Sequence, residues 1–263
     1  MLTTLKSGLR ELTGGLNNQA QWLYLGVQDI KLRYRRSIIG PWWVTISTGI
    51  MILMLSILWS KIFASDIKTY MPFFAIGFII WGWMSSIITE SANGFAPFQA
   101  TIKQIKLPFP VFVLRLCMRL MIVLAHNFLI IFLVLFIVGD GVTWLSLLSV
   151  PAIILIQLNL ICLSVIIMIF CTRFQDMTQV VGTLTQILFF FTPILWQPES
   201  LKNRAYLIEF NPIHHWMEII RAPLIGNIAS MNSWLWSLGT LALLLTTSIY
   251  ALGRYRSRIA FWL

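Results

Sequence analysis

Charged side chains are scarce in this sequence. Asp, Glu, Lys and Arg make up 11% of its 263 residues, whereas soluble domains carry about 25%. Hydrophobic residues make up 58%, and the mean hydropathy is +0.83. This composition excludes an ordinary soluble globular protein and predicts a membrane protein.

Residues that could hold a metal or carry out chemistry are few and scattered. The three cysteines lie far apart inside apolar segments, which indicates neither a disulfide framework nor a zinc knuckle. His214 and His215 are adjacent, so on a helix they point about 100° apart, and no metal site is predicted. The nine acidic residues stand singly. No catalytic residue is therefore predicted, and the chain is not expected to be an enzyme.

Sequence motifs that would supply energy or catalysis are missing. Without a G-x-x-x-x-G-K-[ST] loop, the chain cannot hold nucleotide phosphates as P-loop proteins do. It also lacks a G-x-S-x-G elbow and an H-E-x-x-H helix. A proton-driven carrier would place acids at mid-membrane, whereas Glu90 and Asp140 lie at the ends of apolar segments. The pattern indicates a pore or scaffold whose energy source lies elsewhere.

Long segments of the chain contain no charged residue at all. A helix needs roughly 20 apolar residues to cross a bilayer core about 30 Å thick. We therefore predict an all-α membrane protein with six transmembrane helices. The charge-free segments are residues 37–60, 69–89, 120–139, 141–172, 177–198 and 222–253.

The N-terminal residues are predicted to form an amphipathic helix on the membrane surface. Leu2, Leu5, Leu9, Leu12 and Leu16 recur at steps of three and four, which places them on one helical face. A loosely ordered tail is the alternative, because glycines interrupt the segment. We expect one transmembrane domain over residues 1–263, with an interfacial region at 1–36, the six spans at 37–253 and a tail at 254–263.

Basic residues are distributed unevenly between the two sides of the predicted spans. Lys and Arg are retained on the cytoplasmic side, and most of them fall on the side that carries both ends of the chain. Both termini are therefore expected in the cytoplasm, with Arg115 and Arg119 at the cytoplasmic start of the third span. The basic residues of this side are Lys6, Arg10, Lys31, Arg33, Arg35, Arg36, Lys103, Lys106, Arg115, Arg119, Arg173, Arg254, Arg256 and Arg258.

Two cytoplasmic connections have a defined pattern. A short helix is predicted between Pro97 and Pro108, because proline suits a first helical turn and also a stop. Such a helix either floats at the lipid headgroups or docks into a partner's groove. In the polar turn at residues 172–177, Arg173 and Asp176 can pair or contact the same partner. The apolar face of the short helix would carry Phe98, Ile102 and Ile105, and its other face Lys103 and Lys106.

Residues 193–231 form neither a clean loop nor a clean span. Prolines divide them into pieces too short to cross a bilayer, while aromatic residues keep them apolar. Asn211 and Pro212 make a good helix start, as cap and first helical residue. We predict two short re-entrant or interfacial helices, which act either as an exit gate or as a structural plug against lipid.

Taken in order along the chain, these segments resemble the polysaccharide-export permeases of the ABC-2 transporter superfamily. The O-antigen and capsule exporters are the most similar. The most diagnostic part is the basic and aromatic segment 29–43, which ends in Gly40-Pro41-Trp42-Trp43. The others are Lys106-Leu107-Pro108, Arg173-Phe174-Gln175-Asp176, and Asn211-Pro212 with Glu218 and Arg221.

The resemblance implies a homodimer of six-span subunits in the bacterial inner membrane. A separate cytoplasmic ATPase, present in two copies, would bind ATP and Mg²⁺, so no cofactor is expected in this chain, and no nucleic acid partner either. The cargo would be a lipid-linked polysaccharide of the undecaprenyl-diphosphate type. Residues 98–106 would be the coupling helix, with the 172–177 turn nearby and a periplasmic gate between residues 197 and 227. Coupling would use Phe98, Gln99, Ile102, Lys103, Ile105, Lys106, Arg173 and Asp176, and the gate Asn211, Pro212, Trp216, Glu218 and Arg221.

Aromatic and basic residues supply the remaining candidates. A sliding sugar chain needs broad, weakly binding surfaces, which aromatic rings provide, although interfacial rings also anchor proteins without any cargo. Guanidinium groups bind phosphate bidentately, although the same charges also attract anionic lipid. The candidates for lining a path are Trp42, Trp43, Trp59, Trp81, Trp83, Phe189, Phe190, Phe191 and Trp196. Those for capturing a diphosphate headgroup are Arg33, Tyr34, Arg35 and Arg36.

Two other functions are compatible with the sequence. An ABC-2 exporter could carry teichoic acid, capsule, a drug or haem, because cargo is set by local chemistry rather than by the fold. A membrane-embedded transferase acting on lipid-linked sugars would need clustered acids or a base, and this sequence offers only single acids.

Overall fold

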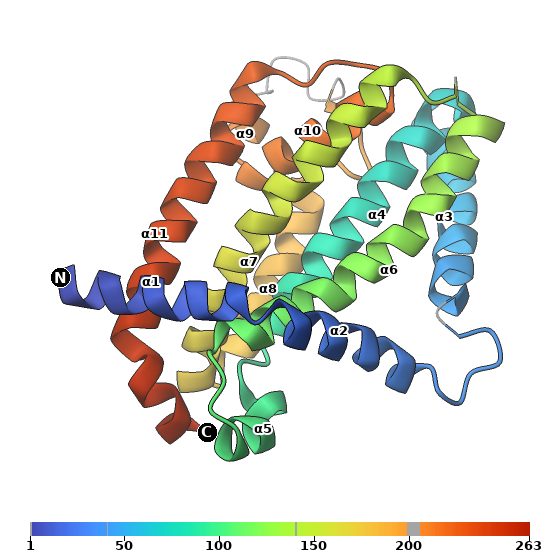
Figure 1. Cartoon of the computed structure of the whole chain (residues 1–263). Helices are drawn as coiled ribbons and strands as arrows, with labels where there is room; N and C mark the ends of the chain where they lie inside the picture. Colours follow the sequence, from blue (N-terminus) through green and yellow to red (C-terminus); the bar gives the residue numbers. More distant parts are fainter. Residues whose placement is uncertain (1, 41, 140, 199–205) are drawn as a thin grey trace.

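The computed structural model describes residues 2–40, 42–139, 141–198 and 206–263, and its regular elements within these ranges are all helical (Figure 1). The expected all-α class is therefore confirmed. The α-helices are α1 (Leu2–Asn17), α2 (Gln19–Arg33), α3 (Trp42–Ile62), α4 (Ile67–Ser91), α5 (Gln99–Gln104), α6 (Pro110–Ile137), α7 (Ser149–Arg173), α8 (Met177–Phe191), α9 (Tyr206–Glu209), α10 (Pro212–Leu224) and α11 (Met231–Trp262). Two 3-10 turns are η1 (Ala96–Phe98) and η2 (Trp144–Leu148).

Five segments of the described chain are long and apolar enough to cross a membrane. They are α3, α4, α6, η2 with α7, and α11. The chain is therefore an integral membrane protein. Figure 1 shows these helices side by side, with α1, α2 and α5 at one end of the bundle and α9 and α10 at the other. Below, these are called the basic end and the opposite end. Both chain ends lie toward the basic end in Figure 1.

The sixth predicted span coincides with α8, which has 15 residues. A helix of that length is about 22 Å long, shorter than the hydrocarbon core. The chain beyond it, residues 192–196, is not helical but is held by the protein: Tyr70 Oη donates to Leu195 O at 2.6 Å, and Arg221 Nη1 to Pro193 O at 2.8 Å. Irregular backbone at membrane depth requires such internal partners. The count of six spans remains a prediction.

The last predicted span has different limits in the structure. The charge-free segment 222–253 contains a turn, in which Gly226 has a φ of +85°, and α11 begins only at Met231. At its other end α11 continues to Trp262, so all but the last of the residues predicted as a tail, 254–263, extend the helix. Ser230 caps the start of α11 by accepting from Ser233 N at 3.2 Å.

A buried polar network joins three helices. In α7, Asn159 donates through Nδ2 to Ser237 O at 3.2 Å and accepts through Oδ1 from Thr240 Oγ1 at 3.0 Å, both in α11. From α10, Trp216 Nε1 donates to Thr240 Oγ1 at 3.0 Å. Lipid is as apolar as the helix surfaces, so membrane helices associate through packing and polar contacts of this kind. The network fixes α10 and α11 against α7.

The predicted N-terminal helix is present as α1, which crosses α11 at the basic end (Figure 1). The backbones touch where Gly8 meets Gly253: an added Cβ on Gly8 would lie 1.9 Å from Ile249 O, and one on Gly253 would lie 2.0 Å from Thr4 O. Of the predicted leucine face, Leu12 packs on the core while Leu9 and Leu16 are exposed. A surface helix that lies flat on a membrane keeps such residues toward lipid.

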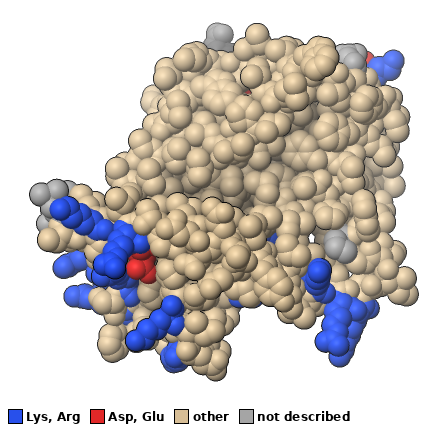
Figure 2. All heavy atoms as spheres, in the orientation of Figure 1, with Lys and Arg blue, Asp and Glu red and all other residues tan. Residues whose placement is uncertain are grey.

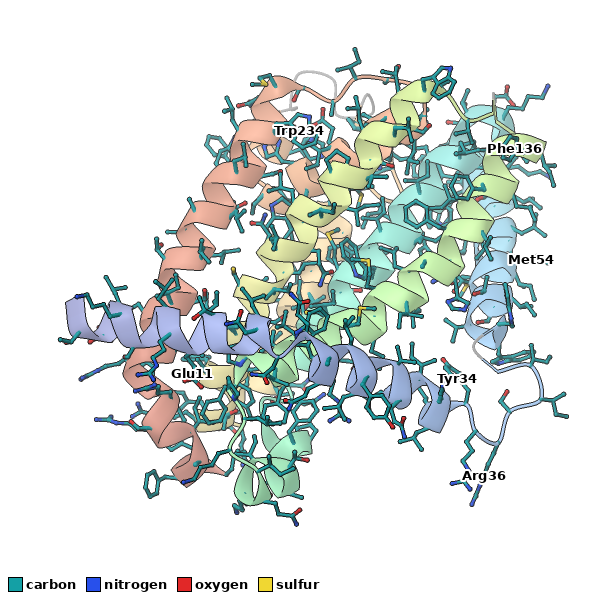
Figure 3. All side chains as sticks on the ribbon, viewed as in Figure 1. Glu11, Tyr34, Arg36, Met54, Phe136 and Trp234 are labelled. Carbon is teal, nitrogen blue, oxygen red and sulfur yellow. The ribbon has the colours of Figure 1, made fainter. Side chains whose placement is uncertain are left out.

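Charged side chains gather at the same end of the molecule as the two chain termini. Figure 2 shows most visible Lys and Arg residues around the basic end, below a broad belt without charge. On the belt, Met54 of α3 and Phe136 of α6 point outward (Figure 3) and are 61% and 68% exposed. Such a surface is suited to contact with lipid.

Candidate functional site

The predicted coupling helix consists of η1 and α5, with Pro97 in its first turn as expected. Phe98 packs between two residues of α6: its ring centroid is 5.1 Å from that of Phe112 and 5.3 Å from the guanidinium carbon of Arg115. Ile102 also packs on the core. Ile105, predicted on the same face, follows the last helical turn in extended backbone and is 53% exposed. The outer surface of the element therefore includes Ile105.

The rest of this outer surface is basic and polar. Lys103, Gln104 and Lys106 are exposed beside Ile105. The inner side is tied to the end of α11, because Gln99 Nε2 donates to Leu263 O. Lys103, although exposed, also places its Nζ 3.4 Å from this oxygen. The element thus offers one apolar side chain with two cations to a partner.

The 172–177 turn lies next to this element, as the resemblance implied. Thr172 Oγ1 accepts from Phe95 N at 2.9 Å, and Thr178 Oγ1 donates to Ala92 O at 2.8 Å. Gly94 makes the approach possible: its φ is +61°, and an added Cβ would lie 2.5 Å from Thr172 Oγ1. Only glycine adopts this conformation without strain and leaves that space.

The two charged residues of the turn, Arg173 and Asp176, are not paired with each other in the described part of the chain. Arg173 is exposed, with its guanidinium 5.0 Å from the ring of Phe174 and 5.5 Å from that of Trp262. Asp176 is exposed at the start of α8, and the described residues form no ion pair between the two. Both side chains are accessible to a partner at the basic end.

The basic segment 33–36 at the end of α2 projects from the molecule. Arg33, Arg35 and Arg36 are exposed and Tyr34 is half-buried, and Arg36 points away from the bundle in Figure 3. Pro41 lies outside the described residues. Capture of a diphosphate headgroup by these side chains stays a prediction.

The nine aromatic candidates fall into different surroundings. Trp81 and Trp83 of α4 are buried inside the chain, with exposed fractions of 7% and 4%. Trp42, Trp43, Phe190 and Phe191 are exposed. Trp59 stacks on Phe63 with centroids 5.4 Å apart, Phe189 lies 5.8 Å from Trp81, and Trp196 Nε1 donates to Phe190 O at 3.2 Å.

A polar stripe on α8 escaped the sequence analysis. Gln179, Thr183 and Gln186 recur at steps of four and three, so they share one face of the helix, and all three are exposed. Phe190 continues the stripe. The spacing was readable from the sequence, but exposure was not. An uncharged polar face on an apolar helix is costly against lipid and is suited to a water-filled path.

At the opposite end, the predicted gate residues hold α10 in place. Asn211 caps α10 by accepting from Ile213 N at 3.0 Å, with Pro212 in the first turn as predicted. Glu218 accepts from Ser233 Oγ at 2.6 Å and from Ser230 N at 3.3 Å, which joins α10 to the start of α11. Trp216 and Arg221 are buried. Among the described residues, α10 packs against α4, α7 and α11.

Two arginines of α6 form ion pairs that sequence reasoning missed. Arg115 binds Asp29 of α2 bidentately, with Nε to Oδ2 at 2.7 Å and Nη2 to Oδ1 at 2.5 Å. Arg119 Nη2 binds Glu90 Oε2 of α4. Both pairs are partly buried at the basic end, which removes the cost of an isolated charge near the membrane.

The family model described as "ABC-2 type transporter" matches residues 20–225. The chain belongs to the ABC-2 type transporter family. The match runs from the start of α2 to the end of α10, so it includes η1, α5, α8 and the ion pairs of α6.

Curated relatives of this ABC-2 chain are named for export. One is the O-antigen export system permease protein RfbA of Myxococcus xanthus, which is 24% identical over 200 residues, covering 71% of this chain and 73% of that protein. Two proteins of the same name from Klebsiella pneumoniae are 23% and 24% identical over 190 residues, with the same coverage. The resemblance predicted from the sequence is confirmed, and the relatives are transport subunits.

Stability of the α10 region of this ABC-2 subunit should depend on pH through His214. Burial lowers the pKa of His214 from 6.5 to about 4, with nearby Arg221 and His215 adding to the decrease and Glu218 opposing it. The unfolded chain therefore takes up a proton below pH 6.5 that the folded chain does not, so stability is lost as pH falls from 6.5 toward 4. We expect a loss of about 2 kcal/mol between pH 8 and 5.

Thermal unfolding in detergent at a series of pH values measures this loss. The variant His214→Asn should unfold with a flatter pH dependence over the same range, because it cannot take up the proton. Equal slopes for the variant and the original protein would contradict the assignment to His214.

Proposed function

We propose that this chain is the membrane subunit of an exporter of lipid-linked polysaccharide of the undecaprenyl-diphosphate type, such as O-antigen. It would work as a homodimer with two copies of a separate cytoplasmic ATPase, in a bacterial inner membrane. The observation that carries the proposal is the match of about seven tenths of the chain to permeases named for O-antigen export. The absence of a P-loop from the sequence agrees with a separate ATPase.

We infer that the basic end faces the cytoplasm, because Lys and Arg are retained there. With both chain ends at that end, an even number of crossings is required. Alpha-helix α8 together with residues 192–196 would make the sixth crossing, and α9 and α10 would return into the opposite side of the membrane as the gate. The whole chain would then form one transmembrane domain.

The proposed path for the glycan runs along α8. Its polar stripe carries amides and a hydroxyl, which can exchange hydrogen bonds with sugar hydroxyls and with water. Among the described residues, α8 packs mainly on α4 and α7 and the stripe is exposed, so we infer that the stripe faces away from the protomer and toward the place of a second copy. Phe190 adds a ring face to it, whereas Trp81 and Trp83 would support the path from behind.

The ATPase would bind the outer surface of η1 and α5. Ile105 is the informative residue to change, because Ile102 packs on the core and a charge there would disturb the fold. Ile105→Asp should reduce stimulated ATPase activity and export at least tenfold, since it places a charge where an apolar side chain meets the partner. Measurements would use the permease co-expressed with the ABC ATPase subunit of its source organism, then purified in nanodiscs.

A matched control introduces the same charge elsewhere at the basic end. Thr3 is exposed in α1, far from α5 (Figure 1), and Thr3→Asp should leave ATPase activity and co-purification unchanged. If Ile105→Asp behaved like this control, the η1 and α5 element would not be the ATPase contact.

A further inference from the structure

A polar cavity of about 540 Å³ lies between α2, α4, η1 and α6 at the basic end. Its volume is within the range of small-molecule sites. Five charged side chains line it: Asp29 and Arg33 of α2, Glu90 of α4, and Arg115 and Arg119 of α6. Three guanidinium groups against two carboxylates leave the cavity with an excess of one positive charge.

The three arginines of the cavity differ in the hydrogen bonds that they already form. Asp29 holds Arg115 by two hydrogen bonds. Arg119 binds Glu90 through Nη2 alone, and its Nε is shielded from solvent with no acceptor among the described residues. Buried donors in native proteins nearly always have a partner. Arg33 is exposed and forms no ion pair within the described part of the chain. The guanidinium groups of Arg119 and Arg33 are therefore able to donate hydrogen bonds to a further anion.

The position of the cavity favours an anion carried by a lipid. It is lined by the last residues of α2 and lies at the basic end. Its lining residues from α4 and α6 belong to the apolar spans. A diphosphate at this level would have its lipid chain beside the bundle and its phosphates against Arg33 and Arg119. Planar guanidinium groups are well suited to bind such phosphate oxygens.

The cavity also contacts the coupling element. Arg115 lines the cavity, and its guanidinium carbon lies 5.3 Å from the ring centroid of Phe98, another lining residue. An anion that enters the cavity competes with Asp29 for Arg115. A shift of this guanidinium would change its contact with Phe98, and through Phe98 the position of η1 and α5.

We propose that this cavity is the binding site for the phosphate groups of a lipid-linked diphosphate, with Arg119 and Arg33 as its ligands and Arg115 as the link to the coupling element. Glu90 and Asp29 hold the arginines in place until the anion arrives. That the anion is lipid-linked rests on the proposed function, whereas binding of a diphosphate rests on the cavity alone.

The test uses the permease alone, without the ATPase, in nanodiscs of neutral phosphatidylcholine. Binding of a short-chain polyprenyl diphosphate is measured by calorimetry, next to the matching polyprenol and inorganic pyrophosphate. We expect the polyprenyl diphosphate to bind, and Arg119→Gln and Arg33→Gln each to weaken it by about tenfold, the value of one charge-assisted hydrogen bond. Lys6→Gln, which removes an exposed cation of α1 outside the cavity, should have no effect.

A second variant gives an effect of opposite sign. Glu90→Gln removes the carboxylate that competes for Arg119, so the polyprenyl diphosphate should bind about tenfold more tightly. A merely structural ion pair would instead make this variant weaker or unstable. Because Arg119→Gln leaves Glu90 without its cation, the double variant Glu90→Gln with Arg119→Gln is the folding control and should bind as weakly as Arg119→Gln.

Three results would overturn the proposal. They are no binding of either diphosphate, weaker binding by Glu90→Gln, or equal competition from phosphatidylglycerol, which would show nonspecific attraction to anionic lipid. Inorganic pyrophosphate binding as tightly as the lipid would keep the site and overturn the lipid-linked source. Since no ATPase is present, these outcomes are independent of the Ile105→Asp test of the proposed function.

Discussion

Single cysteines introduced at Gln179, Thr183 or Gln186 will react rapidly with a charged, membrane-impermeant thiol reagent. These positions form the polar stripe of α8, which is exposed and faces away from the protomer core. The thiolate is the reacting species, and it forms in water, whereas a thiol in hydrocarbon stays protonated. We expect labelling at least tenfold faster than at the lipid-facing positions of α8, measured by mass spectrometry over time in intact membranes.

The matched controls lie one residue further along the same helix. Val180, Leu184 and Ile187 are 44%, 52% and 53% exposed in the isolated chain, but they point about 100° away from the polar stripe. The three native cysteines are buried, so the background labelling is low. Equal rates at the two sets would mean that α8 has no separate water-facing side, and the proposed path would have to run elsewhere.

The long helices could be predicted because the requirement that produces them is local. A span must be apolar over its own length, so a charge-free segment locates it without reference to the rest of the chain. Boundaries were less accurate where apolar residues continue through a turn. The segment 222–253 has no charge, yet Gly226 turns the chain and α11 begins only at Met231. The caps were readable, as at Asn211, since capping depends on neighbouring residues.

The site was less predictable because it depends on contacts between distant segments. Asp29 and Arg115 are 86 residues apart in sequence and Glu90 and Arg119 are 29 apart, so single charges in the sequence gave no indication of two pairs around one cavity. The sequence also did not indicate which aromatic side chains are buried. Composition gives the number of aromatic rings, but the burial of Trp81 and Trp83 follows from packing around α4. The polar stripe on α8 was the part of the site that could have been predicted, since the spacing of its residues in the sequence is enough to place them on one face of the helix.

The glycines of the first segment illustrate how one pattern supports opposite interpretations. Glycine weakens an isolated helix, which favoured a loosely ordered tail. In the structure, Gly8 instead permits α1 to touch the backbone of α11 at Gly253. A helix crossing of this kind needs small residues. The same residue that lowers helix propensity therefore secures the docked helix.

Substitution of Gly8 by alanine should detach α1 from the bundle, whereas the same change at Gly14 should be harmless. The new Cβ would lie 1.9 Å from Ile249 O at Gly8 but 3.4 Å from the nearest atom at Gly14. Both changes favour the helix by about 1 kcal/mol, so only the clash separates them. For Gly8→Ala we expect a net loss of about 3 kcal/mol, seen as faster proteolysis within α1 and a thermal midpoint in detergent lower by roughly 6 to 12 °C.

A second pair repeats the comparison on the other partner of the crossing. In α11, a Cβ on Gly253 would lie 2.0 Å from Thr4 O, whereas Gly239 has no atom within 4 Å of that position. Gly253→Ala should therefore reproduce the loss caused by Gly8→Ala, and Gly239→Ala should unfold at or above the original temperature. Because the backbones must separate in either clashing variant, the two changes together should cost little more than one alone. Four variants of equal stability would show that α1 does not dock on α11.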